Sequence, residues 1–159
     1  MKYWWIIQSL EALNQHPDLI GCGLKEGTDR PTHSKFAEIK KGDYIVYYAT
    51  GDMVLVGIFE VVSDMEMLRD DEYWGDDAIF KLKPFVMPTE GFFVNWKKLL
   101  FDSAVSFDLF PKKERWVYKI WKHYIHQLSA RDFETIKTAI ASRKYEVPAN
   151  VEEKTILKG

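Results

Sequence analysis

Three strand-like stretches decide the fold of this chain: YWWIIQS at residues 3–9, YIVYY at residues 44–48 and VLVGIFEVV at residues 54–62. β-branched and aromatic residues dominate them, which is typical of strands that pack on a core. The turn-forming residues 50–52 join the last two stretches, which predicts a hairpin. A lysine-glycine-acid turn at residues 40–43 precedes that hairpin. This order indicates a module that binds a ligand, because no nucleophile motif or metal cluster accompanies it.

The chain has the size and composition of an ordinary globular protein. It has 159 residues, of which 47% are hydrophobic and 29% charged, enough for one core without disulfides or metals. Residues 1–144 are expected to form a single domain, and the polar segment 145–159 is interpreted as a tail. Cys22 is the only cysteine. No stretch approaches the length of a membrane span, so we expect a soluble, cytoplasmic protein that binds no membrane.

Helical and strand signals surround the three stretches. The sequence predicts a strand over residues 78–86 and helices over residues 10–15, 35–40, 95–101, 112–126 and 130–142. Gly57 lies inside the third stretch, which indicates a β-bulge or a close approach of two backbones. Together these elements predict one α+β domain, a curved sheet or small barrel with helices around it.

The net charge of −2 hides two segments of opposite sign. Residues 64–77 carry seven acidic residues and one arginine, and we interpret them as a solvent-facing loop. Residues 112–126 carry five basic residues and one glutamate. A polyanion would therefore have to bind the basic face and avoid the acidic segment.

The basic segment 112–126 has two readings that do not exclude each other. Its apolar residues recur at helical spacing, so its rings can pack inward while the lysines stay in water. Alternatively, the cations contact phosphates, which positions a nucleic acid without reading its sequence. The candidate phosphate contacts are Lys112, Lys113, Arg115, Lys119 and Lys122.

Motifs for catalysis, cofactors and metals give no positive signal. The sequence contains neither a nucleophile elbow nor a phosphate-binding glycine loop. His123 and His126 are three residues apart, but a zinc site needs three or four converging ligands. We therefore expect no cofactor and no metal.

A candidate pocket lies where the first strand, the Gly-rich loop and the mouth of the barrel meet. Alternation places Trp5 and Ser9 on one side of the first strand and Gln8 on the other. Tyr48 lies near the end of the second strand, and Trp74 ends the acidic segment. A base has a flat face and polar edges, so rings beside a hydroxyl suit it. The alternative is that these rings fill the core.

At this point the sequence resembles an EVE domain of the PUA-like superfamily and, more distantly, a YTH domain. The likeness covers roughly residues 2–142. It is carried by residues 3–9, 39–43, 46–48, 57–61 and 128–133.

The resemblance implies a PUA-like β-barrel of five to six mostly antiparallel strands flanked by short helices. It also implies binding of RNA or DNA, single-stranded or with a flipped base, and in many members a modified base in an aromatic pocket. By motif position Ser9 would hydrogen-bond the ligand, Tyr48 would line the pocket and Trp74 would form a cage wall.

The sequence departs from the family pattern in two places. Many members have Trp and then Gly-Val-Arg-Asn in the loop, where this chain reads IGCGLK at residues 20–25. Many also have His where this chain has Ala49. The pocket would then be rebuilt by Arg30, His33 or Tyr47.

Two other functions stay open on the sequence. A small enzyme that acts on nucleotides or RNA would need a carboxylate or imidazole beside the pocket, such as Glu60 or His33. A protein-interaction module would use the aromatic surface instead.

Overall fold

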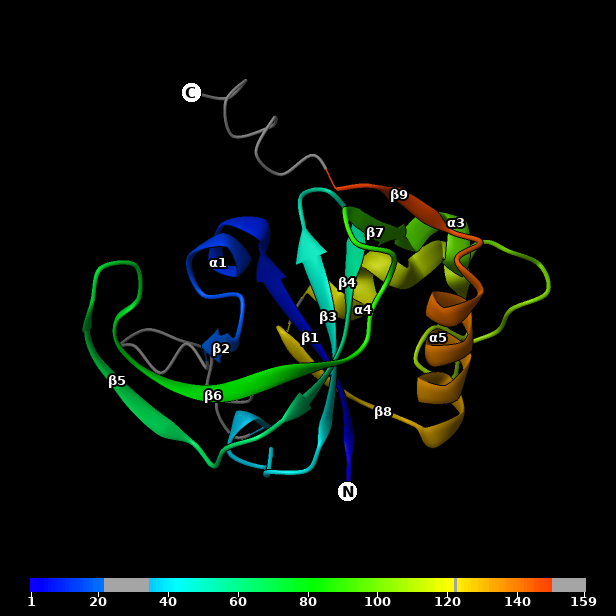
Figure 1. Cartoon of the computed structure of the whole chain (residues 1–159). Coiled ribbons are helices and arrows are strands. Elements are labelled where there is room, and N and C mark those ends of the chain that lie inside the picture. Colours follow the sequence, from blue (N-terminus) through cyan, green and yellow to red (C-terminus); the bar gives the residue numbers. More distant parts are fainter. Residues whose placement is uncertain (22–34, 122, 150–159) are drawn as a thin grey trace.

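The computed structural model describes residues 1–21, 35–121 and 123–149 (Figure 1). These residues form a nine-stranded sheet that curls into a half-closed barrel, with short helices packed against it. The predicted α+β architecture is therefore confirmed.

The elements follow one another along the chain with short connections. The strands are β1 (Tyr3–Ser9), β2 (Leu19–Gly21), β3 (Tyr44–Thr50), β4 (Val54–Val61), β5 (Glu66–Asp71), β6 (Gly75–Val86), β7 (Phe92–Asn95), β8 (Ile125–Leu128) and β9 (Glu146–Pro148). The helices are α1 (Leu10–Gln15), α3 (Trp96–Leu100), the 3₁₀ turn η1 (Lys113–Arg115), α4 (Trp116–Trp121) and α5 (Ala130–Ser142).

The strand order of the main path is β2-β6-β4-β3-β1-β8, with β5 on β6 and with β7 between β4 and β9. β3 and β4 form the predicted hairpin. β1 pairs with β3 in parallel, from Tyr3 opposite Tyr44 to Ser9 opposite Thr50. The other pairs of the described sheet are antiparallel. Consequently the first strand ends beside the tip of the β3–β4 hairpin.

The buried carboxylate of Asp43 holds the start of β1 against the start of β3. One oxygen accepts the backbone N–H of Lys2, and the other accepts the indole N–H of Trp4 and the backbone N–H of Lys40, all at 3.0 Å. Gly42 makes the preceding turn with φ of 95°, a conformation that glycine adopts without strain. The turn predicted at residues 40–43 thus fixes the register of the parallel pair.

Gly57 lies at the bulge that the sequence predicted. The β3–β4 register slips after Tyr47, which faces Gly57, so that Tyr48 faces Leu55. A Cβ on Gly57 would lie 2.5 Å from the sulfur of Met87 and 3.2 Å from the carbonyl oxygen of Val86. The Met87 side chain and the Val86 carbonyl therefore crowd this position, and its φ of 155° is one that residues with a side chain rarely adopt.

The two faces of the sheet carry two separate apolar cores. Trp4 and Ile6 of β1 point into the concave side of the barrel. Trp5 and Ile7 point to the opposite face, which α3, α4 and α5 cover. The alternation predicted for residues 3–9 is confirmed, because successive strand residues face opposite sides.

Three of the predicted helices are confirmed as α1, α3 and α5. The Ser129 hydroxyl caps α5 by accepting the N–H of Asp132 at 3.0 Å. The carboxylate of Asp132 does not complete a capping box. It accepts the N–H groups of Asp108 and Leu109 at 2.7 and 2.8 Å and thereby ties the preceding loop to α5.

Two segments differ from the sequence predictions. The acidic segment 64–77 is not a loop, because residues 66–71 form β5 and pair with β6. The helix predicted over residues 112–126 ends at Trp121, and Ile125 begins β8, which pairs with β1. In both cases the backbone N–H and C=O groups bond to a strand that is distant in sequence. Local sequence signals do not reveal such a partner.

The segment 145–159, interpreted as a polar tail, contributes its first residues to the sheet. Tyr145 is buried, and β9 pairs with β7. Residues 150–159 lie outside the described residues. Within the described chain, no helix has the length and apolar character needed to cross a membrane.

We expect Asp43→Ala to lower the free energy of unfolding by about 2–5 kcal/mol, because the buried indole N–H of Trp4 and two part-buried backbone N–H groups lose their acceptor. Asp43→Asn keeps one carbonyl oxygen and should lose less. Urea unfolding measures both. The control is Glu38→Ala, which removes only an exposed ion pair with Lys2 at 3.4 Å and should change stability by less than about 1 kcal/mol. Equal losses for Asp43→Ala and Glu38→Ala would contradict this role of Asp43.

Candidate nucleic-acid interface

Ser9 ends β1 opposite Thr50, beside the tip of the β3–β4 hairpin. This open end of the barrel is called the rim below. Its hydroxyl oxygen accepts the backbone N–H of Ala12 at 3.1 Å and so caps α1. The hydroxyl keeps its own proton for donation, since a serine hydroxyl both accepts and donates. Ser9 therefore combines a structural role with one free donor that α1 holds in place.

Two buried polar groups on the concave face lack partners. The Tyr47 hydroxyl, on a side chain that is 1% exposed, and the amide oxygen of Gln8 find no hydrogen-bond partner among the described residues. Burial raises the pKa of Tyr47, and nearby Tyr73 raises it further, so the phenol stays protonated. Leaving such a group unsatisfied costs about 1–3 kcal/mol, which a bound polar ligand or water would recover.

Gln8 also links this face to β2. Its amide nitrogen donates to the carbonyl oxygen of Gly21 at 2.9 Å. A Cβ on Gly21 would lie 3.3 Å from the indole of Trp74 and 3.1 Å from a carboxylate oxygen of Asp77. The backbone of Gly21 is thus packed directly against Trp74, with Gln8 bonded to its carbonyl.

Trp74 is held at the β5–β6 turn by the carboxylate of Asp71. One oxygen accepts the N–H groups of Tyr73 and Trp74 at 2.9 and 2.8 Å, and the other lies 2.8 Å from Nε2 of His16. The His16 ring stacks on the indole with centroids 4.9 Å apart. Trp74 is 9% exposed. The indole is therefore fixed between α1 and the turn, with one face covered by His16.

Trp5 and Tyr48 lie on the other face of the sheet. Trp5 is completely buried, stacked on Tyr48 at 5.2 Å and packed edge-on against Trp96 at 4.8 Å. Burial raises the pKa of Tyr48 to about 12. These two rings build the core beneath α4, whereas Tyr47 lies in the core of the concave side and Trp74 packs with Leu19 and Ile79. Ser9 ends β1 opposite Thr50. The residues assigned to one pocket by the sequence are thus divided between the two faces.

Three of the sequence-predicted contacts, Arg30, His33 and Lys122, lie outside the described residues. Lys112, Arg115 and Lys119 line a groove of about 380 Å³ together with Phe110 and Tyr118. Lys113 is turned away from it, because its ammonium donates to the carbonyl oxygens of Asp102 and Val105. The structure therefore brings three of the predicted phosphate contacts together and separates the fourth.

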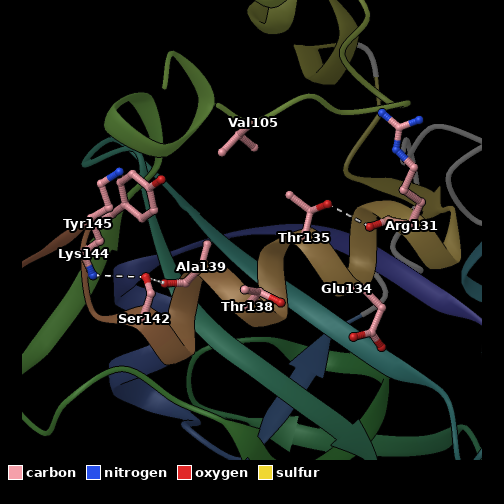
Figure 2. A pocket seen from close by; sticks show the side chains of 9 residues that line it. All are labelled: Val105, Arg131, Glu134, Thr135, Thr138, Ala139, Ser142, Lys144 and Tyr145. Carbon is pink, nitrogen blue, oxygen red and sulfur yellow. Dashed lines mark hydrogen bonds between the residues drawn. The ribbon is translucent and has the colours of Figure 1, made fainter. Parts of the chain in front are cut away.

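A larger groove, of about 500 Å³, runs along the outer side of α5 (Figure 2). Its wall consists of small side chains of α5 with Val105 opposite them. The cations at its ends are engaged, since Arg131 contacts Ser106 at 2.7 Å and Asp108 at 3.5 Å, and Lys144 contacts Asp102 at 3.0 Å. This groove therefore offers less to a phosphate than the groove beside α4.

The carboxylate proposed for the enzymatic alternative lies far from the rim. Glu60 faces Tyr44 at the start of β3, whereas Ser9 faces Thr50 at its end. These two positions are six residues apart along β3, which corresponds to a distance of about 20 Å. Glu60 is also paired with Lys83 at 3.9 Å. Within the described residues, no group of three or more His, Cys, Asp or Glu side chains is arranged to hold a metal ion.

Sequence reasoning missed Gln8, His16 and Asp71. The signal for Gln8 was available, because a polar side chain on the inward face of an apolar strand needs a partner. His16 and Asp71 are 55 residues apart in sequence. Only the packing of α1 against the β5–β6 turn brings that pair together.

Comparison with known proteins identifies the fold through structure. No protein-family model matches the sequence, and no curated protein sequence matches it. Human THYN1 in complex with 5-methylcytosine containing DNA aligns with a TM-score of 0.58 at 11% identity, covering 87% of this chain and 97% of that one.

Two further solved structures have a similar fold. The DUF55 domain of human thymocyte nuclear protein 1 has a TM-score of 0.54 at 11% identity, over 86% of this chain and 97% of that chain. The Mmi1 YTH domain has a TM-score of 0.54 at 11% identity, over 89% and 88%. The chain therefore shares its fold with the DUF55 domain of thymocyte nuclear protein 1 and with the Mmi1 YTH domain, in agreement with the sequence resemblance.

The Asp71 contacts predict a pH-dependent contribution to stability. Hydrogen bonds from the Trp74 and Tyr73 backbones, together with His16, lower the pKa of Asp71 below its ordinary value. Such a group stabilises the fold above its unfolded pKa of about 3.9. Its contribution is lost as the pH falls through the lower folded value.

We therefore expect wild type to be more stable than Asp71→Asn at neutral pH, and the difference to shrink below about pH 4. Urea midpoints measured over a pH series test this. Glu72→Gln, an exposed substitution in the same turn, is the control and should follow wild type. A difference between wild type and Asp71→Asn that stays constant into acid would contradict the assignment.

Proposed function

We propose that this chain is a non-enzymatic module that binds RNA or DNA and holds one base, modified or unmodified, at the barrel rim. The base would lie beside Trp74, with its polar edges toward Ser9, Gln8 and Tyr47. The observation that carries the proposal is the buried Tyr47 hydroxyl without a partner among the described residues. It supports a ligand with a hydrogen-bonding edge, because a native core rarely leaves such a group unsatisfied.

Other observations support the same reading. The fold neighbour THYN1 is in complex with 5-methylcytosine containing DNA. Arg30 and His33, which follow β2 in the sequence and lie outside the described residues, are proposed to contribute. Trp5 and Tyr48 are proposed to support the rim from below, since both are buried on the opposite face. Lys112, Arg115 and Lys119, with Lys122, are proposed to contact phosphates.

The position of Glu60 disfavours the enzymatic alternative in the form that uses this carboxylate; His33, the other candidate base, lies outside the described residues. Its carboxylate would have to act on a group held about 20 Å away along the β3–β4 hairpin. A general base must lie within hydrogen-bonding distance of the proton that it abstracts. We therefore propose binding as the function of the site.

Tyr47→Phe tests the rim, because it removes only the hydroxyl. Free protein should keep its stability or gain slightly, since an unsatisfied buried donor disappears. Affinity for the preferred nucleoside should fall about 10-fold, equivalent to the loss of one hydrogen bond. The measurements are urea unfolding and fluorescence titration with modified and unmodified nucleosides. Tyr44→Phe, on the same strand, is the control and should change neither.

A stability loss in Tyr47→Phe with unchanged nucleoside affinity would show that the hydroxyl is structural. Trp74→Ala should likewise weaken the binding of a modified base. Absence of binding by wild type to RNA and DNA at low salt would remove the proposed function altogether.

The neighbouring residues Lys112 and Lys113 form a matched pair for the phosphate contacts. Lys112→Ala should weaken binding for every sequence and reduce the slope of log K against log salt by about 0.7–0.9. Lys113→Ala should leave this slope unchanged but lower the melting temperature, because its ammonium ties the turn at residues 102–105. Salt-dependent anisotropy titrations and thermal unfolding measure the two effects. Equal slopes for the two variants would contradict the separation of their roles.

A further inference from the structure

α4 exposes aromatic surface that the fold does not need. Tyr118 is 68% exposed and Tyr124, just after α4, is 58% exposed. Neither ring contacts another aromatic ring of the described residues. Large exposed rings on an otherwise well-packed domain indicate a surface that meets a partner.

The helical period explains why Tyr118 points outward. Trp116 and Ile120 are buried in the core beneath the helix. Steps of 100° per residue then place Tyr118 opposite this buried pair and Arg115 and Lys119 together on one flank. All three line the 380 Å³ groove beside Phe110. Arg115 and Tyr118 are one helical turn apart, so their side chains are neighbours.

The cations around Tyr118 are available to a partner. Lys112, Arg115 and Lys119 make no ion pair or side-chain hydrogen bond with any described residue. Arg131, Lys113 and Lys144, by contrast, are all engaged. Glu114 is the acidic residue of this segment and is exposed. The groove therefore presents three uncompensated positive charges around one flat ring.

The surface is continuous with the rim of the barrel. On its other side α4 borders a second groove of about 370 Å³, which Val117 and Tyr124 line together with Thr50 of the hairpin tip. The carbonyl oxygen of Tyr124 accepts the N–H of Ile7 at 2.9 Å, so this end of the groove meets β1 two residues before Ser9. A chain leaving the rim would therefore cross α4 before it reaches the cationic groove.

We propose that Tyr118 is a second base-binding site, on which an unpaired base stacks while Lys112, Arg115 and Lys119 hold its flanking phosphates. This rests on the proposed function, and it specifies the partner as single-stranded nucleic acid. The three positive charges favour a polyanion as the partner. The exposed ring of Tyr118 favours a polyanion that has unpaired bases available for stacking. In a duplex the bases stay stacked on one another and the ring of Tyr118 has nothing to stack on.

The test uses fluorescence anisotropy of the full chain with short labelled single strands and with the same sequences as duplexes. Tyr118→Ala should weaken single-strand binding about 5- to 100-fold, the range for loss of one stacked base. Tyr118→Phe keeps the ring and should bind like wild type. Phe101→Ala, which removes another exposed ring outside this groove, is the control and should have no effect.

Nucleoside titration at the rim separates this proposal from the proposed function. Tyr118→Ala should leave nucleoside binding unchanged. When an abasic site is moved along the strand, it should at one position weaken binding by wild type but not by Tyr118→Ala. Three results would overturn the proposal while nucleosides still bind: equal affinity of wild type and Tyr118→Ala for single strands, equal affinity for duplexes, or full competition by polyglutamate. The last result would mark the groove as a surface for acidic proteins.

Discussion

The parallel pairing of β1 with β3 is the constraint on which the rest of the structure depends, and the Asp43 carboxylate fixes its register. Three donors from the start of β1 and from the preceding turn converge on that one buried group. A parallel pair lacks the short hairpin turn that aligns antiparallel neighbours, so another contact has to set its alignment. Once Tyr3 faces Tyr44, Ser9 must face Thr50, and the end of β1 lies at the tip of the hairpin.

This register also sorts the aromatic residues by face. A shift by one residue would exchange the concave and convex sets, because side chains alternate along a strand. In the observed register Tyr47 points into the barrel with Ile6, and Tyr48 packs on Trp5 beneath α4. Among the described residues, Tyr47 and Gln8 leave buried polar atoms without partners on the concave face, and the indole N–H groups of Trp5 and Trp96 do so in the aromatic core of the opposite face. The proposed base site and the proposed α4 surface thus both depend on this strand register.

Several elements could be predicted from the sequence because their signals are local. The spacing of Phe133, Ile136 and Ile140 defines the buried face of α5, and all three are buried. The bulge at Gly57 could also be predicted, because a glycine inside a strand is a local signal. The acidic segment 64–77 and the end of α4 were predicted incorrectly, because β5 and β8 are strands only through their pairing with β6 and β1. Ile125 fits a helical period and a strand equally well, so its local pattern could not decide.

By itself the sequence determined the class of fold, the alternation of β1 and the presence of a basic aromatic segment, since each depends on neighbours within one element. Only the tertiary structure decided which of two adjacent lysines is free, since Lys113 is held by carbonyls of the turn at residues 102–105. The same holds for Trp74, whose position depends on His16 and Asp71. The physical reason is that hydrogen bonds and ring stacking act over a few ångströms in space, regardless of separation along the chain.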